Sequence, residues 1–237
     1  MKYIILAAGK GVRLNPLTLL YPKCLFELGN GYSILQRMID QILLYDKEAE
    51  IITVIGFMAD TIKQKICKTK FVYNPFYNIT NSIASLWFAK EYLCDDNITI
   101  INGDIVLNSG LTKDVLVKRF DFPLVLLDAT IKKDGDYNVQ VQNDNVVIMS
   151  KDLQNYYGEY VGVVKINKDS VGLFKEEVEK TIAEGYYDQW YENVFNQLIF
   201  NNNFELKFKD VSSYDWTEID CVDDLIKAKN IFYNDNK

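Results

Sequence analysis

Histidine is absent from the 237 residues of the chain. Imidazole is the commonest general base near neutral pH, and it also activates Ser and Cys nucleophiles and binds zinc. Its absence excludes Ser-His and Cys-His mechanisms, His-ligated zinc and imidazole acid–base catalysis. Any chemistry must therefore use Lys, Arg, Asp, Glu, Tyr and metal ions, and we expect a titration near neutrality to belong to a substrate rather than to the protein.

Cysteine and long apolar runs are scarce. The cysteines number four, and they are scattered without C-x-x-C spacing: Cys24, Cys67, Cys94 and Cys221. Isolated cysteines indicate reduced thiols in a cytoplasmic protein rather than a disulfide framework. No apolar run reaches the length of a membrane span, and Met1 leads directly into an apolar strand, so we expect neither a membrane partner nor a cleaved leader.

Acidic residues outnumber basic ones, and the formal net charge is −7. Nucleic-acid binders and proteins of anionic membranes need a basic face, so neither partner is expected. Small molecules remain as substrates, and a local basic site for phosphates is compatible with this composition. The length suits a single domain over residues 1–237, and no pattern indicates an oligomeric state.

Apolar spacing predicts an alternation of strands and helices in the first half of the chain. Strands are expected at 2–8, 50–56, 71–73 and 97–101, and helices at 33–45, 58–67 and 82–93, with Ser33 as an N-cap. Such alternation predicts a parallel sheet covered by helices on both faces. The second half adds strands at 122–128, 137–142, 146–149, 160–166, 204–208 and 216–220 and helices at 169–184, 188–200 and 222–233. We therefore expect an α/β fold with three αβα layers, Rossmann-like, around a mostly parallel mixed sheet.

The turn after the first strand carries the strongest functional signal, Leu6-Ala7-Ala8-Gly9-Lys10-Gly11-Val12-Arg13-Leu14. Glycines let backbone N–H groups approach an anion closely. The segment is not a Walker A motif, and Arg13 stands where a dinucleotide-binding fingerprint has its third glycine, which disfavours an NAD-dependent dehydrogenase. With Lys23, which follows Pro22, the turn is typical of a cradle for a triphosphate; a surface turn with solvated charges is the alternative.

Carboxylates follow or occupy two later strands. Asp104 lies directly after the apolar strand at 97–101. Ligands of parallel α/β sheets bind outside the carboxyl ends of the strands, where a carboxylate is a natural Mg²⁺ ligand. Glu218 and Asp220 lie two residues apart, so strand alternation places both on one face. Asp104 could instead cap a turn, and Asp220 could cap the helix that follows it, a role that is compatible with metal binding.

The order G-x-G-x-R, P-K, N-G-D and a late E-x-D resembles the nucleotidyltransferases that build activated sugars and alcohols. The resemblance covers essentially the whole chain and is strongest to the phosphocholine cytidylyltransferase-like branch of bacterial surface-polysaccharide biosynthesis. Residues 77–86, 158–162 and 215–220 also resemble that branch. The resemblance implies a fold of the nucleotide-diphospho-sugar transferase type, with an NTP-binding half at 1–104, an acceptor-binding half at 105–237 and a small acceptor-binding insertion.

The resemblance also assigns roles to individual residues. It implies Asp104 and Asp220 as ligands of Mg²⁺, and Arg13, Lys23 and Lys151 as catalytic cations, with Lys151 at the acceptor phosphate. The nucleotide pocket is expected to comprise Leu6, Ala7, Ala8, Gly9, Lys10, Gly11, Asn81, Ser85 and Gly103. The implied reaction transfers a cytidylyl group from CTP to a small phosphorylated alcohol such as phosphocholine and releases pyrophosphate. An ionised phosphate is already a nucleophile, so no protein base is required, in agreement with the missing histidines.

Aromatic residues are concentrated in the C-terminal part and indicate where an acceptor would bind. Glu159, Trp190, Tyr191, Trp216 and Glu218 are expected to bind the acceptor, with Glu192 adding to the acidic character of the site. Aromatic faces and carboxylates suit a choline-like cation, and Trp216 should lie close to the acceptor phosphate. Ordinary packing of these side chains is the alternative. A sugar 1-phosphate, a polyol phosphate, another phosphorylated amine or a phosphonate remains open as the acceptor. An inactive nucleotide-binding regulatory module also remains open, although the complete set of cations and carboxylates speaks against it.

Overall fold

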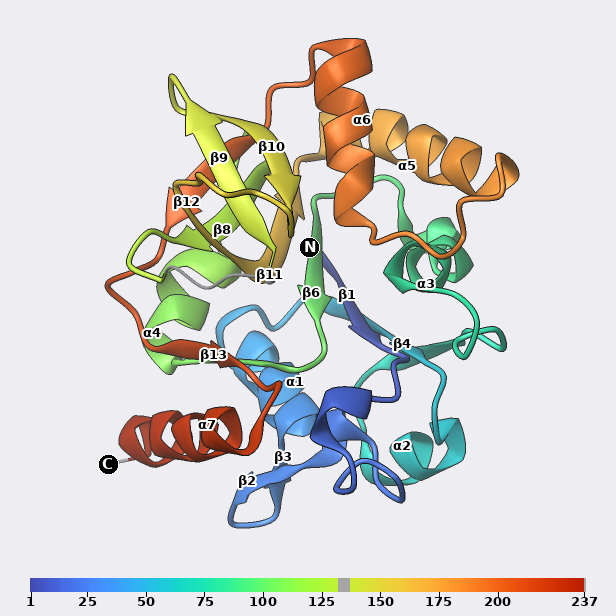
Figure 1. Ribbon diagram of the computed structural model, residues 1–237. Coiled ribbons are helices and arrows are strands. Elements are labelled where there is room, and N and C mark those ends of the chain that lie inside the picture. Colours follow the sequence, from blue (N-terminus) through green and yellow to red (C-terminus); the bar gives the residue numbers. More distant parts are fainter. Residues whose placement is uncertain (132–136, 237) are drawn as a thin grey trace.

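Strand β1 (Lys2–Ala7) lies inside the main sheet because it is apolar toward both faces. Tyr3, Ile5 and Ala7 enter one hydrophobic cluster, whereas Ile4 enters another on the opposite side. The strand pairs in parallel with β4 (Glu50–Ile55) on one side and β6 (Ile98–Asn102) on the other, and β4 pairs in parallel with β5 (Lys70–Tyr73). The computed structural model describes residues 1–131 and 137–236 (Figure 1).

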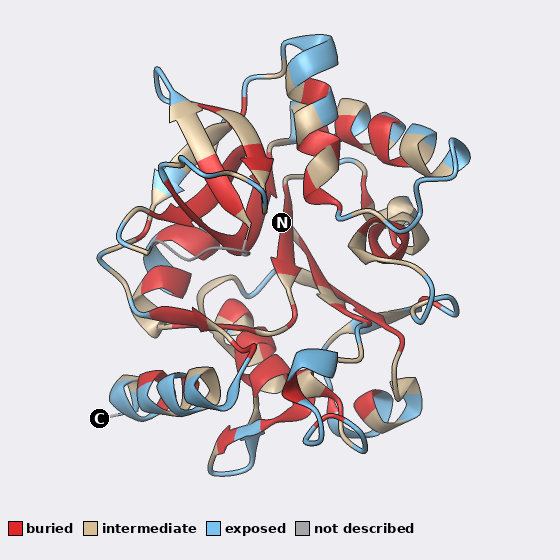
Figure 2. Ribbon diagram, in the orientation of Figure 1, coloured by how far each residue is buried: buried red, intermediate tan, exposed pale blue. Residues whose placement is uncertain are grey.

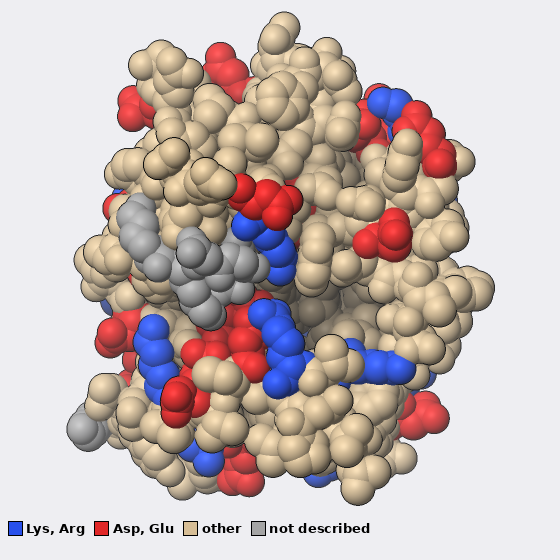
Figure 3. All heavy atoms as spheres, viewed as in Figure 1, with Lys and Arg blue, Asp and Glu red and all other residues tan. Residues whose placement is uncertain are grey.

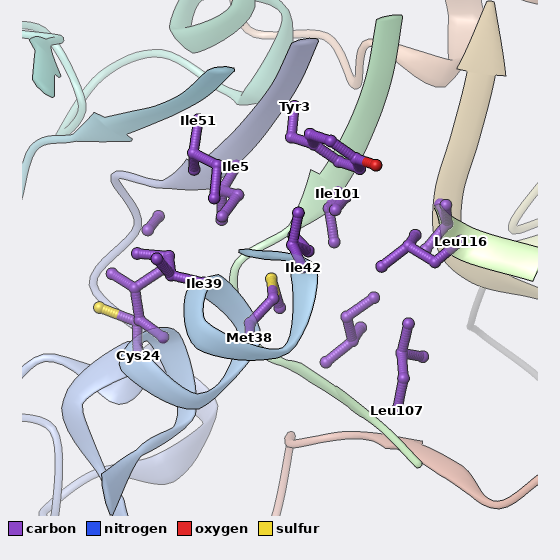
Figure 4. Close-up of a cluster of buried hydrophobic side chains, with 14 of the residues drawn as sticks. Tyr3, Ile5, Cys24, Met38, Ile39, Ile42, Ile51, Ile101, Leu107 and Leu116 are labelled. Atoms are coloured by element: carbon purple, nitrogen blue, oxygen red, sulfur yellow. The ribbon is translucent and has the colours of Figure 1, made fainter. Parts of the chain in front are cut away.

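Helices cover both faces of this sheet. On the face of Tyr3 and Ile5, α1 (Ile34–Tyr45) and α2 (Ala59–Lys65) bury their apolar sides, with Met38, Ile39 and Ile42 of α1 meeting the strands (Figure 4). The other face carries α3 (Ser82–Phe88), α5 (Lys168–Ala183) and α6 (Glu192–Asn202). Figure 2 shows the buried residues concentrated in the strands and the inner helix faces. The predicted three-layer α/β fold is confirmed.

The second half of the sheet differs from the first in strand direction. Among the described residues the order is β5-β4-β1-β6-β11-β8-β12-β10-β9, a nine-stranded sheet. Its later members are β8 (Leu124–Asp128), β9 (Asn138–Gln142), β10 (Asn145–Ser150), β11 (Gly158–Ile166) and β12 (Lys207–Asp210). Strand β11 runs antiparallel to β6, β8 and β9, and only β12 with β8 adds a further parallel pair. The sheet is mixed, and more of it is antiparallel than the sequence pattern indicated.

Short elements complete the fold around the carboxyl ends of β1 and β6. Strand β13 (Trp216–Glu218) pairs antiparallel with β7 (Ile105–Leu107), and β2 (Glu27–Gly29) pairs with β3 (Tyr32–Ser33). Helix α7 (Val222–Asp235) packs against a third cluster with Leu14, Phe26 and Ile219. The remaining turns are α4 (Ser109–Leu111), the π-helix Thr112–Leu116 and the 3₁₀ helices Val12–Leu14, Lys23–Leu25 and Lys90–Tyr92.

Several helices and strands begin or end at other residues than the sequence pattern predicted. Helix α1 begins as expected, because the Ser33 hydroxyl accepts a hydrogen bond from the Gln36 amide at 3.2 Å. Helix α6 begins at Glu192 rather than 188, because residues 187–189 pair their carbonyl groups with the start of α3. Strand β7 was not predicted, since three residues show no periodicity.

The division into an NTP-binding and an acceptor-binding half stays a prediction. No helix in residues 1–131 and 137–236 has both the length and the apolarity to cross a membrane.

A lysine lies inside the sheet layer. Lys165 on β11 is 3% exposed, and its Nζ donates to the Leu116 carbonyl and to the Thr99 hydroxyl. Burial favours the neutral amine and lowers the pKa of Lys165 to about 7. The expectation that a titration of the activity near neutrality belongs to the substrate stays a prediction, since Lys165 lies outside the cavity described below.

Replacing this lysine tests the cost of its burial. Because the unfolded amine has a pKa of about 10.4, the unfolded chain binds the additional proton between about pH 7 and 10, so wild-type stability rises with pH across this window. Lys165→Met removes that dependence, and we expect its melting temperature to exceed that of wild type at pH 7, with the difference shrinking toward pH 10. Calorimetry at both pH values measures this, with exposed Lys118→Met as the control; a difference that does not change with pH would contradict the assignment.

Candidate active site

One cavity of about 290 Å³ opens at the carboxyl ends of β1 and β6. Its first end is formed by the turn after β1, by the start of α3 and by Asn102, Gly103 and Asp104. Its second end includes residues from the β9, β10, β11 and β13 region and from the start of α6. Figure 3 shows this hollow near the centre of one face, with basic side chains around it and acidic groups beside them. A triphosphate and an acceptor could therefore meet in a single space.

Glycine is required at two positions of the first end. Gly11 has φ 65°, a left-handed conformation, and its carbonyl accepts from the Thr18 hydroxyl at 2.8 Å. A Cβ atom on Gly103 would lie 2.8 Å from the Leu6 carbonyl oxygen, so only glycine lets the two segments approach this closely. The turn and Asp104 thus lie side by side because neither glycine carries a side chain.

Most of the predicted nucleotide-pocket residues do line this cavity. They are Leu6, Ala7, Ala8, Gly9, Gly11, Asn81, Ser85 and Gly103. Asn81 caps α3, where its side chain accepts from the Ser82 amide, and the Ser85 hydroxyl accepts from Asn74 at 3.0 Å. Lys10 does not line the cavity. Its role in binding nucleotide stays a prediction that this geometry does not favour.

A cluster of opposite charges lies at the first end of the cavity. The Lys23 Nζ atom is 2.6 Å from the Asp104 carboxylate and 3.2 Å from that of Asp220, and it donates to the Ile219 carbonyl at 2.6 Å. A guanidinium nitrogen of Arg13 lies 2.7 Å from the second oxygen of Asp220. Burial opposes the charged form of Lys23, but Asp104 and Asp220 outweigh it and raise the pKa of this lysine. Residues far apart in sequence therefore meet as predicted.

The two carboxylates do not serve the local capping roles left open above. Cys221 rather than Asp220 is the N-cap of α7, and Asp224 completes a capping box with it: its carboxylate accepts from the backbone amides of Cys221 and Asp220 at 2.8 and 2.9 Å. Asp104 is held by Lys23, and its own carbonyl accepts from the Ile219 amide at 3.1 Å. Both side chains are directed into the charged cluster.

Glu218 adds a third carboxylate. One oxygen from each of Asp104, Glu218 and Asp220 lies within 4.8 Å of the others. Burial and then repulsion by Asp104 and Asp220 raise the pKa of Glu218 well above its ordinary value. Three oxygen donors at this separation match the ligand preferences of a hard divalent cation. The set of residues therefore fits a metal site of the predicted kind, with Glu218 as a further candidate ligand.

The second end of the cavity is aromatic and acidic. The Lys151 ammonium lies 4.4 Å from the ring centroid of Trp190 and 5.9 Å from that of Tyr137. Glu192, the first residue of α6, is 2% exposed, and its Oε2 atom has no hydrogen-bond partner among the described residues. Burial raises the pKa of Glu192 to about 8, opposed in part by Lys151. Burial thus favours the neutral form of the Glu192 carboxyl group at pH 7.

Some predicted acceptor residues lie behind the cavity wall rather than on it. Trp216 is buried in a hydrophobic cluster, and its indole nitrogen donates to Asp128 at 2.8 Å. Tyr191 is buried with its hydroxyl 2.5 Å from that of Tyr160, and Glu159 is buried on β11. The expectation that Trp216 lies at the acceptor phosphate is not met, because its ring packs into the core and its only polar atom is already paired.

Tyr137 is a cavity residue that the sequence analysis missed. Its ring lies 6.4 Å from that of Trp190 at 67°, and its hydroxyl donates to Asn193 at 2.7 Å. Nothing in the sequence distinguishes it from the 15 other tyrosines, since the chain contains 16 in all. Its position depends on the pairing of β9 with β10 and on the packing of α6.

Comparison with known proteins agrees with this geometry. A family model described as nucleotidyl transferase matches residues 2–121. The choline-phosphate cytidylyltransferase of Streptococcus pneumoniae is 27% identical over 246 residues, covering 100% of both chains. The CTP:phosphoglutamine cytidylyltransferase of Campylobacter jejuni is 25% identical over 254 residues, covering 95% of this chain and 98% of the relative.

A solved structure of the CTP:phosphocholine cytidylyltransferase from Streptococcus pneumoniae shares the fold, with a TM-score of 0.76, 21% identity and 98% coverage of both chains. The family match spans just over half of the 237 residues. It includes the glycine turn, Arg13, Lys23 and Asp104, which the structure brings together at one end of the cavity. The chain therefore belongs to the nucleotidyl transferase family.

Proposed function

We propose that the protein transfers a cytidylyl group from CTP to a small phosphorylated alcohol that carries a cation, such as phosphocholine. The observation that carries this proposal is the continuity of one cavity from the glycine turn, through the charged cluster, to the aromatic and acidic end. Support for CTP comes from two cytidylyltransferases whose similarity to this chain extends along nearly their whole length. Support for a cationic acceptor comes from Trp190, Tyr137 and Glu192, which together suit an ammonium group.

The glycine turn and the basic residues would have different roles in binding the triphosphate. Backbone N–H groups of the turn would approach the phosphates, as the absence of side chains at Gly9 and Gly11 allows. Arg13 and Lys23 would neutralise charge on the phosphates and on the departing pyrophosphate. An oxygen of the acceptor phosphate attacks the α-phosphorus, the bond to the β-phosphate oxygen breaks, and that oxygen leaves with the electron pair. No proton has to be removed, so no general base is needed.

Asp104, Asp220 and Glu218 would hold a Mg²⁺ ion. When bound, such an ion supplies positive charge that stabilises the negative charge of the reacting phosphates. Lys23 already places a positive charge against Asp104 and Asp220. We propose that the Lys23 ammonium offsets the repulsion between the carboxylates before substrate binds. It would then turn toward the triphosphate.

Pyrophosphate release provides the direct test of this function. We expect release with CTP and phosphocholine in the presence of Mg²⁺, weaker release with phosphoethanolamine, whose ammonium is more strongly hydrated, and none with hexose 1-phosphates, whose hydroxyls would be left without partners. The four NTPs are compared against each acceptor, and excess EDTA should abolish the reaction. Efficient turnover of a sugar 1-phosphate without turnover of phosphocholine would transfer the assignment to a sugar nucleotidyltransferase, and no turnover with any pair would favour a regulatory module.

Lys23→Ala should lower kcat by about 10²–10³, the loss typical of removing one charge that stabilises a transition state. Lys10→Ala is the matched control, because it removes a lysine of the same loop region that does not line the cavity. Steady-state kinetics and circular dichroism separate a catalytic loss from unfolding. Turnover of a folded Lys23→Ala enzyme within about threefold of wild type is incompatible with the role proposed here.

The acceptor KM should depend on pH through Glu192, whose pKa burial raises to about 8. A carboxyl group gains its negative charge as pH rises through its pKa, so attraction for an ammonium acceptor increases between about pH 7 and 9. We expect the wild-type KM for phosphocholine to fall over this range while the KM for CTP stays constant. Glu192→Gln should show a flat profile for both substrates, and a pH-dependent fall that persists in the variant would remove Glu192 from the acceptor site.

A further inference from the structure

The aromatic end of the cavity already holds a cation of the protein itself. We define the cage as Tyr137 and Trp190, whose rings lie 6.4 Å apart at 67°. The Lys151 ammonium sits over both rings, 4.4 Å from one centroid and 5.9 Å from the other. The Lys151 side chain is half-buried, and among residues 1–131 and 137–236 no carboxylate lies within salt-bridge distance of its ammonium, so the two rings are its direct contacts in the cavity.

The backbone that carries Lys151 is fixed relative to the cage. The Asn196 side chain on α6 accepts from the Met149 amide at 2.9 Å and donates to the Met149 carbonyl at 2.7 Å. These bonds join the end of β10 to the helix that follows Trp190. Tyr137 is joined to the same helix through Asn193. The Lys151 side chain can therefore leave the rings without movement of this backbone, because a cation–π contact is a weak interaction.

We propose that Lys151 is an exchangeable internal cation, which makes the site select acceptors that carry both an ammonium and a phosphate; this rests on the function proposed above. An incoming ammonium and the Lys151 ammonium cannot share the cage, because like charges repel at that distance. The acceptor's own phosphate offers Lys151 a stronger partner nearby. One zwitterionic molecule thus both replaces the lysine on the rings and receives it at its phosphate.

Glu192 completes the arrangement. Its Oε2 atom faces no hydrogen-bond partner among the described residues while its carboxyl group is buried beside the cage. A cation in the cage therefore lies near a buried carboxyl group, and its positive charge favours the ionised form of that group, as Lys151 does in this structure. When Lys151 moves to a phosphate, the acceptor ammonium takes over this position. A free cation such as choline displaces Lys151 without offering it a partner, and a phosphate without a cation leaves the cage empty once Lys151 departs.

Two ligands that differ only by the phosphate test the exchange. Calorimetry measures the Kd of choline and of phosphocholine for wild type and for Lys151→Met. We expect Lys151→Met to bind choline about tenfold more tightly, the equivalent of one cation–π contact that no longer has to be broken. The same variant should bind phosphocholine more weakly than wild type, because the phosphate loses its partner.

Lys90→Met is the matched control, since the Lys90 ammonium also lies 4.4 Å from a tryptophan centroid, that of Trp87, but outside the cavity. It should change neither Kd. Lys151→Gln serves as a second variant if Lys151→Met does not fold. Tighter choline binding in a Lys151 variant supports the exchange even if phosphocholine is not turned over, an outcome that would overturn only the proposed function. Choline binding that is unchanged, weaker or absent in both folded variants overturns the exchange.

Discussion

Three carboxylates held within 4.8 Å of one another repel, and the site depends on the cations that offset this repulsion. Lys23 bridges Asp104 and Asp220, and Arg13 binds the outer oxygen of Asp220. The pairing of β13 with β7 supplies the backbone that brings the third carboxylate, Glu218, opposite Ile105. The charged cluster therefore links the turn after β1, the end of β6 and the segment before α7 by ion pairs. Removing one charge would weaken the contacts among all three segments.

Both ends of the cavity share one electrostatic arrangement. At the first end the Lys23 ammonium lies among carboxylates suited to a metal ion, and at the second the Lys151 ammonium lies on aromatic faces suited to an acceptor cation. Each lysine has a phosphate as its expected partner. Under the exchange proposed above, each lysine would pass from one partner to another when a charged substrate binds, so neither ammonium would be buried without a partner.

The family match covers the first end of the cavity but not the second. The family match at residues 2–121 includes the glycine turn and Asp104 but ends before Tyr137, Lys151, Trp190 and Glu192. The two cytidylyltransferase relatives differ in the acceptor that their names give, choline phosphate and phosphoglutamine. The residues that would distinguish acceptors in this chain flank the hairpin β9–β10 and lie at the start of α6, away from the parallel part of the sheet.

Sequence pattern alone was enough for the layered α/β fold, the glycine turn and the position of Asp104 at a strand end, whereas the ion pairs of Lys23 with Asp104 and Asp220 were not predicted. These features depend on local rules: apolar spacing, the N-cap at Ser33, and the tendency of strand ends to meet at one edge of a sheet. The strand directions of the second half and the elements of two or three residues carry too little periodicity for such rules. Their positions depend on pairing partners that lie far away in sequence.

Only the tertiary structure decided which aromatic and acidic residues face the cavity. Trp216 and Trp190 look alike in sequence, but packing against the core and a bond to Asp128 turn the first away, while the second stays at the cavity wall. Burial also raises the pKa of Glu192 to about 8 and lowers that of Lys165 to about 7, shifts that the residue types alone do not indicate. Side-chain direction and desolvation are properties of the packed molecule, because both depend on neighbours that the linear order does not specify.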